Sequence, residues 1–204
     1  IRECGFPLAA PSANLSNQVS PTSAEHVRKQ LRGRLRWIVD GGPSQVGIES
    51  TVLDLTARPP RALRPGMIHA ETLAAVLGET PSRDKQMAVE TETLRSPGML
   101  RKHYAPRAKV LVLNWHDALD LKSQLSNRKR DSVGAWVVAH TCIPAAADFA
   151  GVSVMPHDAE AYARALYAEW HRCDEAGVEV IVMESLPDLP GWGGLADRLR
   201  RAAA

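Results

Sequence analysis

Short apolar runs and regularly spaced apolar residues divide the chain into two structured stretches, one before and one after a polar segment. In the first stretch, apolar runs that lie between turn residues predict strands at residues 6–10, 37–39 and 48–55. Apolar residues recur every four positions from Val27 to Leu35, which predicts an amphipathic helix. A capping box should open this helix, with Thr22 at the cap and Glu25 reaching back to it.

The second stretch alternates between strand and helix patterns. Strands are predicted at residues 110–113, 133–139, 152–155 and 178–183, and helices at residues 117–125, 158–176 and 195–203. Strands that alternate with helices predict a mostly parallel sheet covered on both faces. A further short helix at residues 73–77 closes the first stretch and should end at Gly78. Residues 79–107, between the stretches, are polar and rich in Pro and Gly, which predicts a linker.

Composition and charge describe an ordinary soluble globular protein. The 204 residues are 45% hydrophobic and 24% charged, with a net charge of +2, which is too small to argue for nucleic-acid binding by itself. No signal peptide or apolar run of membrane-spanning length is visible, so no membrane partner is expected. The three cysteines form no CxxC pair and the seven histidines show no HExxH spacing. We therefore predict no disulfide framework, no metal site and a cytoplasmic location.

Four polar motifs carry the candidate chemistry. They are APSANLSNQVSPT at residues 10–22, VGIESTV at 46–52, ALRPG at 62–66 and SPGMLRKHYAP at 96–106. Loops rich in hydroxyl groups, Gly and Asn present N–H and O–H groups to phosphate, and Arg adds a charge-assisted fork. Arg64 is the main candidate for binding phosphate, because the Pro65-Gly66 turn would fix its backbone and a guanidinium suits a triphosphate. The motifs predict a nucleotide site.

Together these motifs resemble the Sua5/YrdC/YwlC family, the L-threonylcarbamoyladenylate synthases of tRNA modification. The resemblance implies an α/β fold, in which a truncated YrdC-like domain with a twisted mixed sheet precedes a Rossmann-like Sua5 domain. The domains would be residues 1–78 and 109–204, joined by a linker at 79–108. In the family, a substantial N-terminal portion supplies further Lys and Arg contacts to ATP. Because the first motif follows Ile1 almost at once, we expect this portion to be missing and the site to be incomplete.

The resemblance also implies roles for individual residues. The ATP-binding residues would be Ser12, Asn14, Ser20, Arg64 and Tyr104, and Ser50 would bind L-threonine. For Asn14, a purely local role in holding its turn is an equal alternative. Asn17 stands where many relatives have Gly, and Asn tolerates the left-handed conformation that such a turn needs. Glu49 is more simply a solvated or paired carboxylate than a catalytic base. No catalytic residue is assigned.

The implied reaction joins L-threonine, bicarbonate or CO₂, and ATP into threonylcarbamoyl-AMP and releases pyrophosphate. Mg²⁺ would accompany the nucleotide, and the adenylate would pass to the downstream tRNA threonylcarbamoyl transferase machinery, with tRNA itself as a possible partner. Such a displacement at phosphorus needs positioning and charge stabilisation more than a protein nucleophile.

Two other functions remain open. One is a carbamoyl-phosphate-dependent carbamoyl-adenylating domain, which the fourth motif and the C-terminal domain count against. The other is a non-catalytic RNA-binding or regulatory module, suggested by Arg28, Lys29, Arg32 and Arg34 in the first helix. GWGGLA at residues 191–196 fits a loose dinucleotide-binding pattern, but only eight residues follow it. A tight turn is therefore predicted there.

Overall fold

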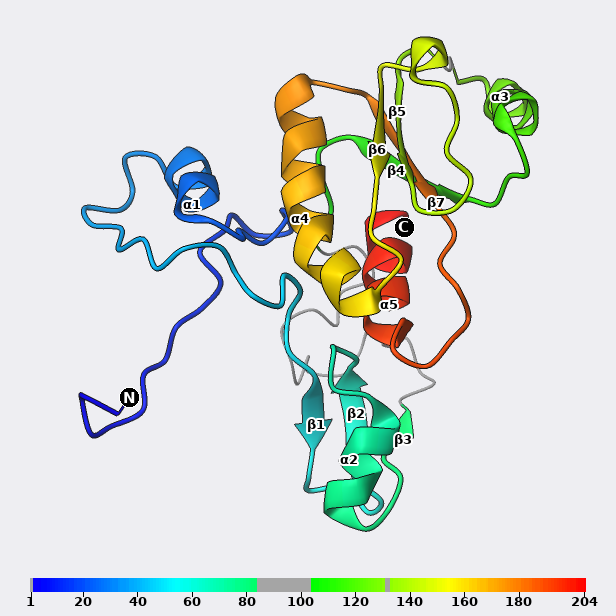
Figure 1. Cartoon of the computed structure of the whole chain (residues 1–204). Coiled ribbons are helices and arrows are strands. Elements are labelled where there is room, and N and C mark those ends of the chain that lie inside the picture. Colours follow the sequence, from blue (N-terminus) through cyan, green and yellow to red (C-terminus); the bar gives the residue numbers. More distant parts are fainter. Residues whose placement is uncertain (1, 84–103, 131–132) are drawn as a thin grey trace.

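The computed structural model describes residues 2–83, 104–130 and 133–204, which fold around two separate sheets (Figure 1). The first sheet has three strands in the order β1-β2-β3, with β1 at Val52–Asp54, β2 at Arg61–Arg64 and β3 at Ser82–Arg83. Strands β1 and β2 are antiparallel and β2 and β3 are parallel, so the sheet is mixed, as predicted. Helix α2 (Ala70–Leu77) lies against this sheet and ends at Gly78, whose φ of 76° confirms the predicted left-handed cap.

The second sheet is parallel and has the strand order β4-β7-β5-β6. Its strands are β4 (Lys109–Leu113), β5 (Ala135–Ala139), β6 (Gly151–Val154) and β7 (Val180–Glu184). Helix α3 (Ala118–Asn127) follows β4, the 3₁₀ turn η1 (Ala146–Asp148) follows β5, α4 (Ala159–Ala176) follows β6 and α5 (Gly193–Ala202) follows β7. This is the alternating α/β pattern that the sequence predicts, and the fold class is confirmed.

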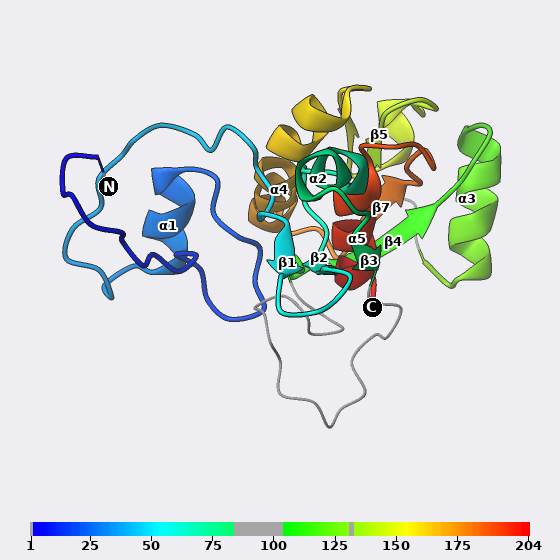
Figure 2. The ribbon, with the colours of Figure 1, turned by 90° about the horizontal axis from the view of Figure 1, so that it is seen from below.

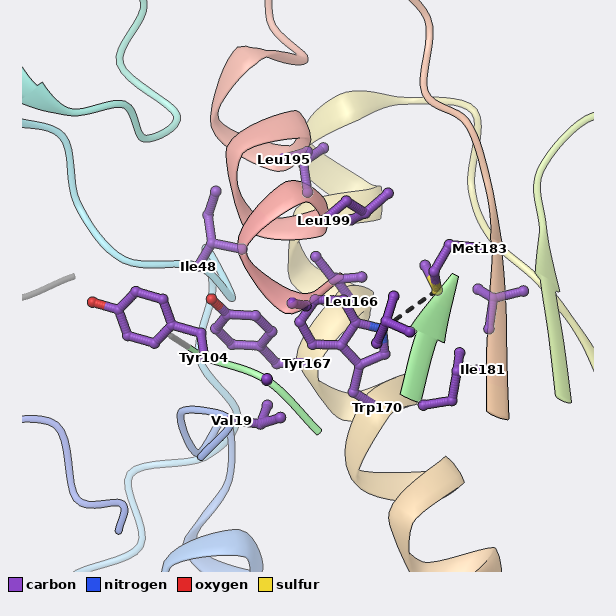
Figure 3. Packing of buried hydrophobic residues seen from close by; sticks show 14 of the residues in the cluster. Val19, Ile48, Tyr104, Leu166, Tyr167, Trp170, Ile181, Met183, Leu195 and Leu199 are labelled. Carbon is purple, nitrogen blue, oxygen red and sulfur yellow. Dashed lines mark hydrogen bonds between the residues drawn. The ribbon is translucent and has the colours of Figure 1, made fainter. Parts of the chain in front are cut away.

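Alternate residues of the central strand β7 face opposite sides of the sheet. Val180 and Val182 belong to the apolar cluster that contains the α3 side chains, whereas Ile181 and Met183 belong to the cluster of α4 and α5. Trp170 of α4 packs there and donates from its indole nitrogen to the Met183 sulfur at 3.4 Å (Figure 3). Helices therefore cover both faces of the parallel sheet, as predicted.

The core on the α4 side also includes residues from the first stretch of the chain and from the end of the linker. Val19, Ile48 and Tyr104 are buried in the same cluster as Trp170 (Figure 3). A single parallel bridge between Gln18 and Ala105 brings the first and fourth motifs side by side. The first, second and fourth motifs are thus anchored on the apolar core of the parallel sheet.

Several predicted elements of the first stretch are wrong. Residues 6–10 and 37–39 form no strand and are exposed, with Val39 94% accessible. The third predicted strand is reduced to β1, while residues 48–51 run in an irregular path. A strand is stable only where a neighbour completes its hydrogen bonds, and in the described ranges the sheet beside β1 offers only β2. An apolar run alone cannot show whether such a neighbour exists.

The first helix is shorter than predicted. Helix α1 spans Ala24–Gln30, so Leu35 lies beyond its end. Its cap is Ser23, whose hydroxyl accepts from the His26 N–H at 3.3 Å, and the predicted capping box does not form. Glu25 is instead paired with Arg28. Figures 1 and 2 both place α1 to one side of the sheets, beyond α4.

Most of the predicted linker and of the fourth motif, residues 84–103, lies outside the described residues. The part that is described contributes β3 at one end and Tyr104 at the other. Strands β2 and β3 were not predicted as strands, because both are short and polar.

Candidate functional site

The antiparallel pairing of β1 with β2 builds the centre of the candidate site. Its register places Arg64 opposite Val52, beside the segment that carries Ser50. The guanidinium of Arg64 donates from Nε to the Ser50 carbonyl at 3.0 Å and from Nη2 to the Ser50 hydroxyl at 3.3 Å. Its Nη1 donates to the Tyr104 hydroxyl at 2.9 Å. Three residues predicted from three separate motifs therefore meet at one place.

Burial distinguishes these three residues. Arg64 and Tyr104 are buried, at 8% and 2% exposed, whereas Ser50 is exposed at the edge of the group. A guanidinium held by a carbonyl and by a phenol has its plane fixed before any ligand arrives. The exposed Ser50 hydroxyl lies next to this fixed charge. The arrangement suits an anionic group bound at Arg64 and a small polar ligand bound next to it at Ser50.

Ser20 joins the same group through Glu49. Its hydroxyl donates to Glu49 Oε1 at 2.6 Å, while Glu49 Oε2 accepts from the Tyr167 hydroxyl at 2.9 Å and from Arg198 Nε at 2.8 Å. Glu49 is therefore paired, in line with its simpler interpretation from the sequence. Three hydrogen bonds, one of which is also an ion pair with Arg198, hold this carboxylate in place, so it can position its neighbours.

The remaining predicted residues lie apart from this group. Asn14 donates from its side-chain amide to the Leu15 and Gln18 carbonyls, each at 3.0 Å, so it holds its own turn. Asn17 has a φ of 64°, which confirms the predicted left-handed turn. Ser12 is exposed, and no hydrogen bond within the described ranges connects it to Glu49 or Arg64. A contact of Ser12 or Asn14 with ATP stays a prediction.

Two residues that the sequence analysis missed complete the group, Tyr167 of α4 and Arg198 of α5. Arg198 is fully buried, and it lies among the buried α5 residues Leu195, Leu199 and Ala202. A charged residue within an apolar stripe must find a partner inside the protein. That position in the stripe is the signal that could have identified Arg198.

The electrostatics favour protonated phenols at Tyr104 and Tyr167 and a charged guanidinium at Arg198. Burial, and then the charge of Glu49, raise the pKa of Tyr104, and Arg64 offsets only part of this rise. Burial and Glu49 also hold the pKa of Tyr167 well above its ordinary value. Burial opposes the charge of Arg198, but Tyr167, Glu49 and Asp197 raise its pKa above the usual value. The site therefore combines neutral phenol hydroxyls with charged groups that hydrogen bonds hold in place.

Two glycines allow the motifs to pack directly on one another. A Cβ atom on Gly66 would lie 2.4 Å from the Thr51 nitrogen, and one on Gly194 would lie 2.7 Å from the Gly66 carbonyl oxygen. The third motif therefore lies against the second, and the turn of GWGGLA lies against the third. The predicted tight turn is confirmed, since residues 190–191 form a turn with a φ of 99° at Gly191.

A pair of stacked histidines lies beside this group. The rings of His26 and His171 lie 3.9 Å apart, and His171 Nε2 contacts the Ser20 carbonyl oxygen at 3.1 Å. Burial, and then the neighbouring His171, lower the pKa of His26 to about 4, and burial also lowers the pKa of His171. Both rings are thus held in the neutral form.

We expect the melting temperature to fall as the pH is lowered from 6.5 towards 4. In that window the unfolded chain binds protons that the folded histidines refuse, so protonation favours unfolding. Thermal unfolding of the wild type and of His26→Gln across this window measures the effect, and the variant should have the flatter profile. His116→Gln, which changes an exposed histidine, should keep the wild-type slope. Equal slopes for the wild type and His26→Gln would contradict the prediction.

Throughout the residues that the structure describes, no helix is both long and apolar enough to cross a membrane. The same residues contain no group of three or more His, Cys, Asp or Glu side chains that could hold a metal ion.

Comparisons with known proteins match the whole length of the chain. The family described as "Threonylcarbamoyl-AMP synthase, C-terminal domain" matches residues 68–204, and the family described as "Telomere recombination" matches residues 1–66. The threonylcarbamoyl-AMP synthase of Bacillus subtilis is 38% identical over 204 residues, which cover 100% of this chain and 59% of that protein. The synthase of Pyrococcus abyssi is 34% identical over 200 residues, covering 97% of this chain and 58% of that protein.

Solved structures give the same result. The crystal structure of Pyrococcus abyssi Sua5 complexed with L-threonine matches with a TM-score of 0.80 and 32% identity, over 95% of this chain and 56% of that chain. The chain thus spans a little under three fifths of the length of these relatives. The chain belongs to the threonylcarbamoyl-AMP synthase family, the Sua5/YrdC/YwlC family that its four motifs resemble.

Proposed function

We propose that this chain forms part of a cytoplasmic L-threonylcarbamoyladenylate synthase, which makes threonylcarbamoyl-AMP and pyrophosphate from L-threonine, bicarbonate or CO₂, and ATP. The observation that carries the proposal is the convergence of Arg64, Ser50 and Tyr104 from three motifs. The names of the two relatives and the L-threonine in the Pyrococcus structure support it. The adenylate would pass to the tRNA threonylcarbamoyl transferase machinery.

The proposed chemistry is a displacement at the α-phosphorus of ATP. The threonine amine first adds to CO₂ and loses a proton to solvent, or adds to bicarbonate with loss of water, and an oxygen of the resulting carbamate then attacks the α-phosphorus while pyrophosphate leaves. Arg64 would stabilise the charge on the phosphates, and Ser50 would hold the threonine beside it. The reaction needs no protein nucleophile, and positioning of this kind supplies most of the catalysis. Mg²⁺ would enter on the phosphates, which is the usual arrangement for this ion.

The test is a search for the product by mass spectrometry. The 204-residue chain, and a version with whatever sequence its gene encodes upstream of Ile1, are each incubated with ATP, bicarbonate and L-threonine. Threonylcarbamoyl-AMP from either version supports the proposal. No product from either version, while carbamoyl phosphate does give an adenylate, would overturn it in favour of the carbamoyl-adenylating alternative. No product with either donor would also overturn it.

The RNA-binding alternative loses part of its basis in the structure. Arg28 is paired with Glu25, and Lys29 is paired with Glu175 of α4 at 2.6 Å. Two of the four basic residues that suggested it therefore serve contacts within the protein. Salt-dependent binding of RNA without ATP turnover would revive this alternative.

Substitution of Arg64 tests the nucleotide site directly. We expect Arg64→Lys to weaken ATP binding on the order of 10-fold to 100-fold, because a lysine keeps the charge but loses the planar fork. Isothermal titration calorimetry with ATP in the upstream-extended version measures the change. Arg61→Lys, at the other end of β2, is the matched control and should bind like the wild type. Unchanged affinity in Arg64→Lys would remove Arg64 from the proposed site.

A further inference from the structure

A single side chain of the last helix contacts three of the four motifs. Arg198 of α5 donates from Nε to Glu49 Oε2 at 2.8 Å and from Nη2 to the Glu49 carbonyl at 3.2 Å. Its Nη1 donates to the Pro65 carbonyl at 3.1 Å. The guanidinium carbon lies 5.5 Å from the centre of the Tyr104 ring. The second, third and fourth motifs are therefore joined through one buried cation.

The two carbonyls that Arg198 binds belong to the immediate neighbours of the proposed substrate-binding residues. Glu49 precedes Ser50, and Pro65 follows Arg64. The same guanidinium thus fixes the backbone on either side of the Arg64–Ser50 contact. A shift of about 1 Å in groups that position substrates can cost on the order of 100-fold in rate. Arg198 is therefore placed to affect the geometry of the site through the backbone.

Asp197 and Glu49 fix the orientation of Arg198. Asp197, which is itself buried, accepts from Arg198 Nη1 at 2.9 Å and is also bound by Arg200 and Arg201. Glu49 also accepts hydrogen bonds from Ser20 and Tyr167. A buried cation is costly unless its hydrogen bonds are satisfied, and all three guanidinium nitrogens of Arg198 have acceptors here. The cation is therefore rigidly placed.

We propose that Arg198, acting through Glu49, is a positioning residue for the synthase site, so that helix α5 of the C-terminal domain is a working part of that site. The expected kinetic effects rest on the proposed function, whereas the claim that Arg198 holds the two segments rests on the contacts alone. It assigns the C-terminal domain a direct role in holding the ESTV and LRPG segments in their binding geometry.

The first experiment measures steady-state kinetics in the upstream-extended version, with Arg198→Gln and Arg198→Lys. We expect kcat/KM in Arg198→Gln to fall on the order of 100-fold, with KM rising for both ATP and L-threonine. A purely structural role would reduce the fraction of active protein and leave both KM values unchanged. Arg198→Lys should be intermediate, because a lysine can pair with Glu49 but cannot also serve both carbonyls.

The matched control is Arg200→Gln, which removes an exposed arginine from the same helix and the same Asp197 partner. This variant should retain the wild-type KM and kcat. A folded Arg198→Gln with wild-type KM for both substrates would overturn the proposal. Should Arg198→Gln fail to fold, Arg198→Lys decides, and unchanged KM values in that variant would overturn the proposal equally.

Hydrogen exchange separates this proposal from the proposed function. Amide exchange in residues 46–52 and 62–66 should be faster in Arg198→Gln than in Arg200→Gln, whether or not any product forms. Faster exchange together with an inactive wild type would mean that Arg198 does hold these segments and that the proposed synthase function is wrong. Unchanged exchange in a folded Arg198→Gln would show that α5 does not hold these segments, and would overturn the inference.

Discussion

Replacing Glu184 by alanine is expected to lower the free energy of unfolding by about 3 kcal/mol or more. Glu184 ends β7 and is buried, and its carboxylate accepts from three consecutive backbone N–H groups after β5. These donors belong to His140, Thr141 and Cys142, at distances of 2.6, 2.8 and 3.1 Å. Successive N–H groups of this kind form an anion-binding nest, and here the protein supplies the anion itself.

Thermal unfolding measures the effect of Glu184→Ala, which for a chain of this size should lower the melting temperature by about 10 °C. Glu179→Ala is the control, because it removes an exposed glutamate just before the same strand. Formate should restore part of the stability of Glu184→Ala, since a free carboxylate can occupy the vacated nest. A loss no greater than that of Glu179→Ala would show that the nest contributes little to stability.

The nest also bears on what the second sheet can bind. In open parallel sheets, ligands bind beyond the carboxyl ends of the strands, and phosphates often bind to exposed N–H groups there. At this edge an open cavity of about 550 Å³ is lined by residues of the loops after β4, β5 and β7, none of them Lys or Arg. Glu184 occupies the three N–H groups that would otherwise face an anion. The ATP site that we propose is therefore better placed near Arg64 than on the Rossmann-like sheet.

The second half of the fold could be predicted from the sequence because its signals are local. Each strand from β4 to β7 is a short apolar run, and each helix repeats its apolar residues at the helical period. The first half could not, because its strands depend on partners that no local pattern reveals. Residues 37–39 have the composition of a strand, yet no described strand lies beside them.

The candidate site could likewise be predicted only in part from the sequence. Arg64 and Ser50 could be selected from their motifs, but their contact depends on the β1–β2 register, which only the folded sheet fixes. Arg198 is 149 residues from Glu49 and belongs to no motif, so only its place among buried α5 residues distinguishes it. Motifs identify groups that can bind substrates. The residues that position those groups come from distant parts of the chain, and the structure was needed to find them.

Gly47→Ala is expected to lower the free energy of unfolding by about 2 to 4 kcal/mol, through two effects that add. Gly47 has a φ of 87°, and a Cβ atom there would lie 2.2 Å from the carbonyl oxygen of Ala163 and 2.6 Å from the Cα of Arg164. Both contacts are with the backbone of α4, which cannot rotate away as a side chain would. The segment that leads to Glu49 and Ser50 would have to move off the helix.

Gly177→Ala separates the two effects, because Gly177 also has a left-handed φ, of 71°, but a Cβ atom there would meet nothing within 4 Å. This control should lose only about 1 kcal/mol, which is the cost of the backbone conformation alone. The difference between the two variants in chemical denaturation then measures the packing of the second motif against α4. Equal losses would mean that this segment can shift at little cost, and that the contact with α4 does not set the geometry of the site.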